Sequence, residues 1–132
     1  MGSEGNHTTI LVVEDHADTA EMLSIILQTE GFDVLSASNA AGAMGILSGS
    51  EASRIGVVLL DLTLPDMDGD EAIRKLKNEN VGLPPVLIMS AKPAKSLEDA
   101  ASVLGAAGIV RKPFDIQALL ESIHSALNDE NR

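Results

Sequence analysis

The sequence predicts a three-layer α/β domain in which a parallel five-stranded sheet carries helices on both faces. Two observations lead to this prediction. Short apolar runs that suit buried strands alternate five times with segments of helical periodicity, which is typical of parallel sheets with right-handed crossovers. Polar side chains directly follow four of these runs, at the strand ends where open α/β sheets bind their ligands.

The first half of the chain contains two strand–helix units. Residues 9–13 suit a buried strand, residues 32–37 are predicted to form a second strand, and residues 17–30 repeat apolar side chains at helical spacing. Gly31 then provides a natural helix stop. Asn39 is suited to cap a second helix that extends to about residue 49.

The third unit opens with an unbroken apolar strand at residues 57–60 that stops at Asp61. An ionised carboxylate is costly in an apolar interior, so we expect Asp61 at the mouth of the sheet, within reach of a cation or a lysine. A simpler alternative is that Asp61 only caps the next helix. Asp66 and Asp68 are expected to be turn and cap residues, before a helix at about residues 68–78.

The last two units follow the same pattern. Strands are predicted at residues 85–89 and 108–110, and a helix is predicted from Ser96, which begins a capping-box sequence, to residue 104. The final helix begins near Asp115 and has an apolar stripe that we expect to face the core. This stripe consists of Ile116, Leu119, Leu120, Ile123 and Leu127.

Length and composition limit the classes of function. The 132 residues suit one domain, which we place at residues 9–128, with a disordered leader or expression remnant at 1–8 and a tail at 129–132. The absence of Cys excludes thiolate metal sites, and the net charge of −11 argues against direct nucleic-acid binding. No apolar run approaches the roughly 20 residues of a membrane span, so we expect a cytoplasmic protein with no membrane contact.

The polar residues at the predicted strand ends have complementary chemistry. Glu14 and Asp15 follow the first strand, Asp61 the third, Ser90 the fourth and Lys112 the fifth. Oxygen ligands without Cys suit a hard cation such as Mg²⁺, with Mn²⁺ as a second candidate. A metal, a lysine, a hydroxyl and a free carboxylate can together stabilise phosphoryl transfer, and a carboxylate can itself be the nucleophile.

Four motifs occur in order at these strand ends. They are Glu14-Asp15, Asp61 with Pro65-Asp66-Met67-Asp68-Gly69 after it, Ser90-Ala91, and Lys112-Pro113-Phe114. In these motifs, and over residues 8–127, the chain resembles the response-regulator receiver domains of two-component signalling. The resemblance implies a flavodoxin-like (βα)5 fold with strand order 2-1-3-4-5, which would set the first and third strands side by side.

The resemblance implies that Asp61 accepts a phosphoryl group from the phosphohistidine of a sensor histidine kinase or a histidine phosphotransfer protein. Lys112 would contact the phosphoryl group and Asp61. Ser90 would close onto a phosphoryl oxygen and draw the following loop with it, and a cis peptide is implied between Lys112 and Pro113. The chain would then be a signalling domain that catalyses only its own phosphorylation and dephosphorylation, not an enzyme.

A metal site is also implied by the resemblance. Asp15, Asp61 and the backbone carbonyl of Thr63 would ligate Mg²⁺, and Glu14 would act directly or through water. His16 follows the acidic pair and could reach the site, but a solvent-facing loop histidine is the simpler interpretation.

The sequence departs from the family pattern at two positions. Ile109 stands where receivers usually carry a Tyr or Phe that swings inward on activation, and Lys92 lies beside the expected path of the hydrolytic water. We therefore expect phosphorylation-linked change to concentrate in residues 91–96 and the start of the following helix, with little change around Ile109. A homodimer through the face of the helix at 96–104, the strand at 108–110 and the last helix is a candidate assembly.

Two other classes of function stay open. A phosphatase of the haloacid dehalogenase type also uses a strand-end Asp nucleophile, but Thr63 stands where such enzymes carry their second Asp, and no cap domain fits this length. A receiver-like protein-binding module would not need Asp15, Asp61, Ser90 and Lys112. A phosphate sink would keep these residues without an output switch.

Overall fold

The computed structural model describes residues 8–61, 84–90, 107–112 and 115–130. The helices predicted at residues 68–78 and 96–104 lie outside the described residues. The predicted turn residues Asp66 and Asp68 and the predicted switch segment at residues 91–96 also lie outside them.

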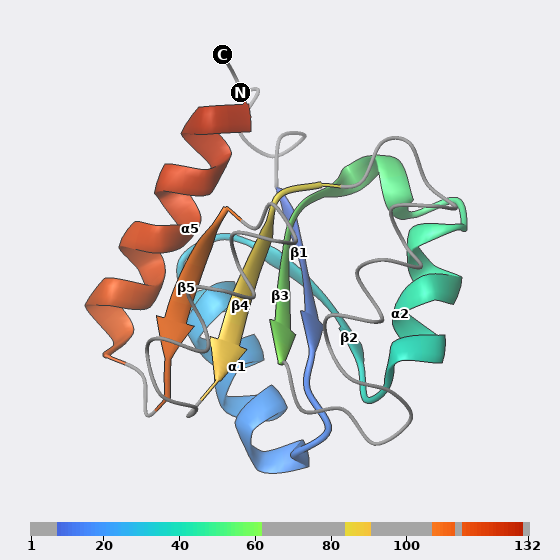
Figure 1. Cartoon of the computed structure of the whole chain (residues 1–132), viewed down its shortest axis with the longest axis horizontal. Coiled ribbons are helices and arrows are strands. Elements are labelled where there is room, and N and C mark those ends of the chain that lie inside the picture. The colour runs from blue at the N-terminus through green and yellow to red at the C-terminus, as the bar shows by residue number, and fades with distance from the viewer. Residues whose placement is uncertain (1–7, 62–83, 91–106, 113–114, 131–132) are drawn as a thin grey trace.

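A parallel five-stranded sheet forms the centre of the molecule, in the order β2-β1-β3-β4-β5 (Figure 1). The strands are β1 (Thr9–Val13), β2 (Asp33–Ala37), β3 (Ile55–Asp61), β4 (Val86–Ser90) and β5 (Gly108–Arg111). The flavodoxin-like strand order is confirmed. The first and third strands are neighbours, with Val13 paired to Leu60, so their carboxyl ends meet at the same edge of the sheet.

Three strands continue to a polar residue at this edge. Asp61 belongs to β3, Ser90 to β4 and Arg111 to β5, so each of these strands ends later than predicted. The register explains the difference, because Asp61 pairs with Met89 and Ser90 pairs with Arg111. The sheet, and not a loop, therefore positions the side chains of Asp61 and Ser90.

Helices cover both faces of the sheet (Figure 1). The helices α1 (Ala17–Thr29) and α5 (Ile116–Glu130) pack on one face, and α2 (Ala40–Leu47) packs on the other. A short 3-10 turn, η2 (Ala52–Arg54), precedes β3. No helix in the described part of the chain is long and apolar enough to span a bilayer.

Two predicted helix boundaries are confirmed. The side chain of Asn39 caps α2, because its Oδ1 accepts the backbone N–H of Gly42 at 2.8 Å. Gly31 has a φ of 96°, a conformation that costs glycine little, and the chain leaves α1 at this residue to enter β2.

The core consists of two mainly aliphatic clusters, one on each face of the sheet. Leu23 and Leu27 of α1 are fully buried, but Met22 beside them is 43% exposed. The prediction that the whole apolar stripe of the last helix is core is wrong for Ile116, which is 52% exposed. Ile116 is the first residue of α5, one turn before Leu119, where burial of this helix begins.

Candidate functional site

Four of the predicted site residues come together at the carboxyl edge of the sheet, the side on which the parallel strands end. Glu14 directly follows β1, Asp61 and Ser90 end their strands, and Lys112 directly follows β5. Backbone hydrogen bonds extend the sheet past these ends: the Glu14 N–H donates to the Ala37 carbonyl at 3.0 Å, and the Lys112 N–H donates to the Ser90 carbonyl at 2.9 Å. Glu14, Asp61 and Ser90 are buried, so the edge of the sheet holds polar groups in an enclosed position.

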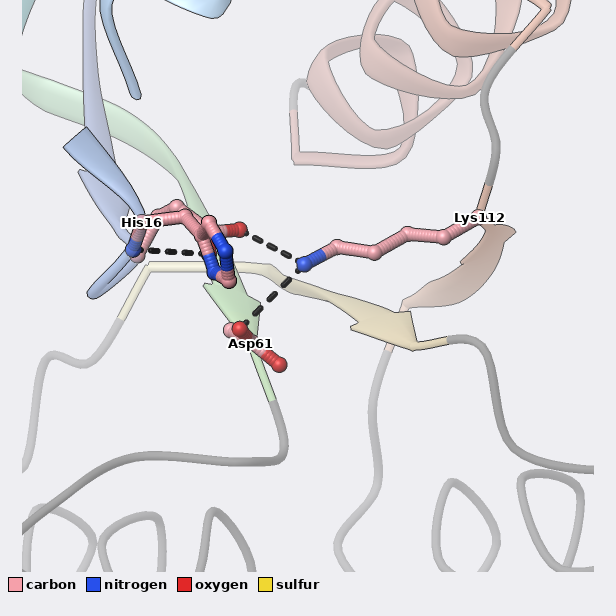
Figure 2. Close-up of polar contacts among 4 residues, drawn as sticks. His16, Asp61 and Lys112 are labelled. Carbon is pink, nitrogen blue, oxygen red and sulfur yellow. Dashed lines mark hydrogen bonds and ion pairs between the residues drawn. The ribbon is translucent and has the colours of Figure 1, made fainter. Parts of the chain in front are cut away.

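Lys112 joins two buried carboxylates. Its Nζ lies 2.7 Å from Glu14 Oε1 and 3.2 Å from Asp61 Oδ2, and Figure 2 shows its side chain reaching across toward Asp61. The exposed fraction is 0% for the Glu14 side chain, 7% for that of Asp61 and 23% for that of Lys112. Because one ammonium faces two carboxylates, the ionised site carries an excess of negative charge.

Burial affects the acid and the base of this cluster differently. Burial raises the pKa of Glu14 above its ordinary range, by more than the hydrogen bonds from Lys112 and from the His16 backbone lower it. Burial alone would lower the pKa of Lys112, but the hydrogen bond to Glu14 and the negative charge of Asp61 outweigh it, and the pKa is raised. Lys112 is therefore a cation at neutral pH, whereas burial makes ionisation of Glu14 less favourable than it is in water.

The exposed residues Asp15 and His16 extend the site toward solvent. One potential ligand atom from each of Glu14, Asp15 and His16 lies within 4.8 Å of the other two, and the described residues contain no other such group. His16 is exposed, as predicted, but no role was predicted for its ring. The signal in the sequence was its position directly after the acidic pair.

The donor set fits a hard divalent cation. Glu14 and Asp15 provide carboxylate oxygens, which are the ligands that Mg²⁺ and Mn²⁺ prefer. Asp61 is not part of this group of three, and its carboxylate contacts Lys112. Thr63 lies outside the described residues, so the predicted ligand set as a whole stays a prediction.

The other predicted positions lie around the site or outside the described residues. Ile109 in β5 is partly buried and packs against the core cluster on the α2 face. Lys92 and Pro113, and with Pro113 the predicted cis peptide, lie outside the described residues. His124 is exposed on α5, and its ring centroid lies 5.8 Å from that of Phe32.

Comparison with known proteins finds relatives over nearly the whole chain. Residues 10–124 match the family model of the response regulator receiver domain. The chain is 36% identical over 125 residues to the probable transcriptional regulatory protein TcrX of Mycobacterium tuberculosis, covering 95% of this chain and 52% of that protein. It is 31% identical over 120 residues to the sensory transduction protein RegX3 of Mycolicibacterium smegmatis, covering 91% of this chain and 50% of that protein.

The fold also has solved counterparts. A response regulator receiver domain protein from Clostridium thermocellum superposes with a TM-score of 0.84 at 26% identity, covering 94% of this chain and 97% of that one. The chain thus spans almost all of this solved receiver domain, but only about half the length of the curated relatives that it matches.

Proposed function

Because the chain belongs to the response regulator receiver domain family, we propose that it accepts a phosphoryl group in two-component signalling and that Asp61 is the acceptor. One observation carries the assignment of Asp61. It is a buried carboxylate at the carboxyl end of β3, and an ammonium lies 3.2 Å from it. Its place in the strand, and not in the loop that follows, favours this role over that of a simple helix cap.

The proposed transfer requires a nucleophile and groups that stabilise the transferring charge. A carboxylate oxygen of Asp61 forms a bond to phosphorus while the phosphorus–nitrogen bond of the donor phosphohistidine breaks, and the electron pair of that bond returns to the imidazole. Lys112, already in contact with Asp61, stabilises negative charge on the phosphoryl oxygens. A Mg²⁺ ion held by Asp15, Asp61 and the Thr63 carbonyl, with Glu14 acting directly or through water, would add positive charge at the same oxygens.

We propose that Ser90 couples phosphorylation to a conformational change. It is buried at the end of β4, and its carbonyl accepts a hydrogen bond from the Lys112 backbone N–H. Its hydroxyl would donate to a phosphoryl oxygen, and change would concentrate in residues 91–96. Ile109 is β-branched and already packed against the core, so we expect little movement there. Amide exchange with and without beryllofluoride and Mg²⁺ tests this expectation. Equal changes at Ile109 and in residues 91–96 would contradict it, and no change in either would favour a phosphate sink.

The proposed partners are proteins. Response regulators partner with sensor histidine kinases, and we propose such a kinase or a histidine phosphotransfer protein as the phosphoryl donor. The net charge of −11 argues against direct binding to nucleic acid. A cytoplasmic location and a homodimer through β5, α5 and the helix predicted at residues 96–104 are further parts of the proposal. Sedimentation of the phosphorylated and unmodified forms tests the dimer.

Intact-protein mass spectrometry tests the acceptor. Incubation with acetyl phosphate and Mg²⁺ should add one phosphoryl group to the wild type and none to Asp61→Asn. Asp33→Asn is the matched control, because Asp33 begins β2 at the opposite edge of the sheet and should not affect the reaction. Phosphodonor turnover without a stable mass gain would instead indicate a phosphatase. No reaction in the wild type would indicate a binding module.

A further inference from the structure

We propose that the imidazole of His16 is a further protein ligand, beside Glu14 and Asp15, in the cation site, so that this site binds a borderline ion such as Zn²⁺ more tightly than Mg²⁺. The inference rests on the proposed function in one respect, because both place a divalent cation beside Glu14 and Asp15. It goes beyond that function because the ligand set proposed above contains only oxygen donors.

The distances allow the three side chains to share one ion. A ring nitrogen of His16 and one carboxylate oxygen each from Glu14 and Asp15 lie within 4.8 Å of one another. Zinc binds nitrogen and oxygen at about 2.0 to 2.2 Å, which puts two ligand atoms of one ion about 3 to 4 Å apart. Asp15 and His16 are exposed, so small rotations of these two side chains can close the group around an ion.

The local backbone directs His16 toward the site. The Glu14 side chain is buried, and its Oε2 accepts the His16 backbone N–H at 3.2 Å. His16 is the residue that precedes α1, yet its side chain makes no capping hydrogen bond to that helix. Figure 2 shows its imidazole turned toward the strand ends, on the side where Asp61 lies. The ring therefore lies at the site without serving as a helix cap.

Lys112 and the proposed ion would bind different oxygens of the Glu14 carboxylate. The Nζ of Lys112 contacts Glu14 Oε1, whereas the His16 backbone contacts Oε2 of the same carboxylate. The ammonium can only donate hydrogen bonds, while a neutral imidazole has a lone pair for a metal. The buried carboxylates of Glu14 and Asp61 exceed the charge of Lys112, which adds an attraction for a second cation.

The nitrogen ligand determines which ion is favoured. Mg²⁺ prefers oxygen ligands and keeps several of its waters, so an imidazole adds little to its affinity. Zn²⁺ binds imidazole and carboxylate well and lies above Mn²⁺ and Fe²⁺ in the affinity order of divalent ions. If Glu14, Asp15 and His16 were its only protein ligands, a tetrahedral zinc ion would keep one position for water or a phosphoryl oxygen.

Calorimetric titration with Zn²⁺ alone and with Mg²⁺ alone tests the inference. His16→Gln should weaken Zn²⁺ binding by about tenfold or more, with a much smaller change for Mg²⁺. The controls are His124→Gln and His7→Gln, which remove the other two histidines of the chain and should leave both affinities unchanged. Zinc-induced shifts of the imidazole nitrogens in NMR spectra should be confined to His16.

Three results would overturn the inference: Zn²⁺ affinity unchanged in His16→Gln, an equal loss in a control variant, or equal losses for Zn²⁺ and Mg²⁺. The last result would mean that His16 supports the fold of the site without binding the ion. Phosphorylation of the wild type with Mg²⁺ is measured separately. Phosphorylation without His16-dependent zinc binding overturns only this inference, and His16-dependent zinc binding without phosphorylation overturns only the proposed function.

Discussion

The two edges of the sheet bury different kinds of side chain. At the carboxyl edge, β1 and β3 lead into the carboxylates of Glu14 and Asp61, which share Lys112. At the amino edge, the same strands begin with Thr9 and Ile55, which are equally well buried, and none of the described residues there is a buried charge. Both edges are enclosed, so burial alone does not identify a site. A buried charge at a strand end is the distinguishing feature.

Close packing is what distinguishes the amino edge. A Cβ added at Gly56 in β3 would lie 2.5 Å from Thr8 Cγ2 and 2.9 Å from Leu127 Cδ2, so β3 approaches its neighbours there as only glycine allows. The Thr9 hydroxyl is buried and has no hydrogen-bond partner within the described ranges. The structure of the amino edge therefore depends on close packing, whereas that of the carboxyl edge depends on charge.

The largest expected effect comes from removing the cation of the carboxyl edge. Lys112→Met leaves two buried carboxylates without their shared ammonium, and we expect the free energy of unfolding at neutral pH to fall by about 2 to 3 kcal/mol. The deficit should shrink toward acid pH, because Glu14, whose pKa is raised by burial, can then take up a proton in the variant. In the wild type, the stabilisation from the raised pKa of Lys112 is present below about pH 10 and is lost as the pH rises through that raised pKa. Urea denaturation across this range measures both trends.

An exposed ion pair provides the control for this experiment. Arg54 lies 2.7 Å from Glu51, and both side chains are largely exposed. Arg54→Met should therefore cost less than about 0.5 kcal/mol. A loss of stability as large as that of Lys112→Met would show that burial of the Lys112 ion pairs is not the reason for their larger contribution.

A smaller effect is expected at the amino edge. Gly56→Val forces the Thr8 and Leu127 side chains to move, and we expect a loss of about 1 to 2 kcal/mol that does not depend on pH. Gly45→Ala in α2 is the control. An added Cβ there meets no described atom within 4 Å, so this variant should gain up to about 1 kcal/mol. A change in Mg²⁺ affinity in Gly56→Val, measured by calorimetry, would contradict the independence of the two edges.

The smallest expected effect is a gain in the free energy of unfolding when Glu14 is replaced by Gln. The pKa of Glu14 is raised by burial, so the folded state holds this proton more tightly than the unfolded state does. The wild type therefore loses stability as the pH rises from about 4 through the raised pKa, and the loss stays constant at higher pH. Glu14→Gln remains neutral throughout and keeps a carbonyl oxygen that can accept from Lys112, so without metal we expect it to gain about 1 kcal/mol relative to the wild type as the pH rises from acid to neutral. This gain should disappear below about pH 4.

Thr9→Val makes the matching change at the other edge. It removes a buried hydroxyl with no partner among the described residues, at nearly constant volume, and we expect a similar gain of about 1 kcal/mol. This gain should be the same at acid and neutral pH, because no titrating group is involved. A pH-dependent gain in Thr9→Val, or a pH-independent one in Glu14→Gln, would contradict the conclusion that buried charge distinguishes the carboxyl edge from the amino edge.

Sequence pattern predicted the strands well because most of them are short apolar runs between turn residues. It placed the ends of three strands too early, since hydropathy does not distinguish a polar residue held in the sheet, such as Asp61 or Ser90, from the first residue of a loop. A similar limit explains why the exposure of Ile116 was not predicted. Periodicity identifies the apolar stripe of a helix but not the turn at which the helix meets the sheet.

The sequence by itself determined the alternation of strands and helices and the chemistry at each strand end, because both depend on neighbouring residues. It also carried the motifs whose resemblance to receiver domains implied the strand order. Only the tertiary structure decided that the shorter contact of Lys112, at 2.7 Å, is with Glu14, 98 residues away in the chain, and that Asp61 has the longer one. It also decided that the His16 ring lies beside the carboxylates of Glu14 and Asp15. Such contacts depend on strand register and side-chain direction, which no local pattern of residues encodes.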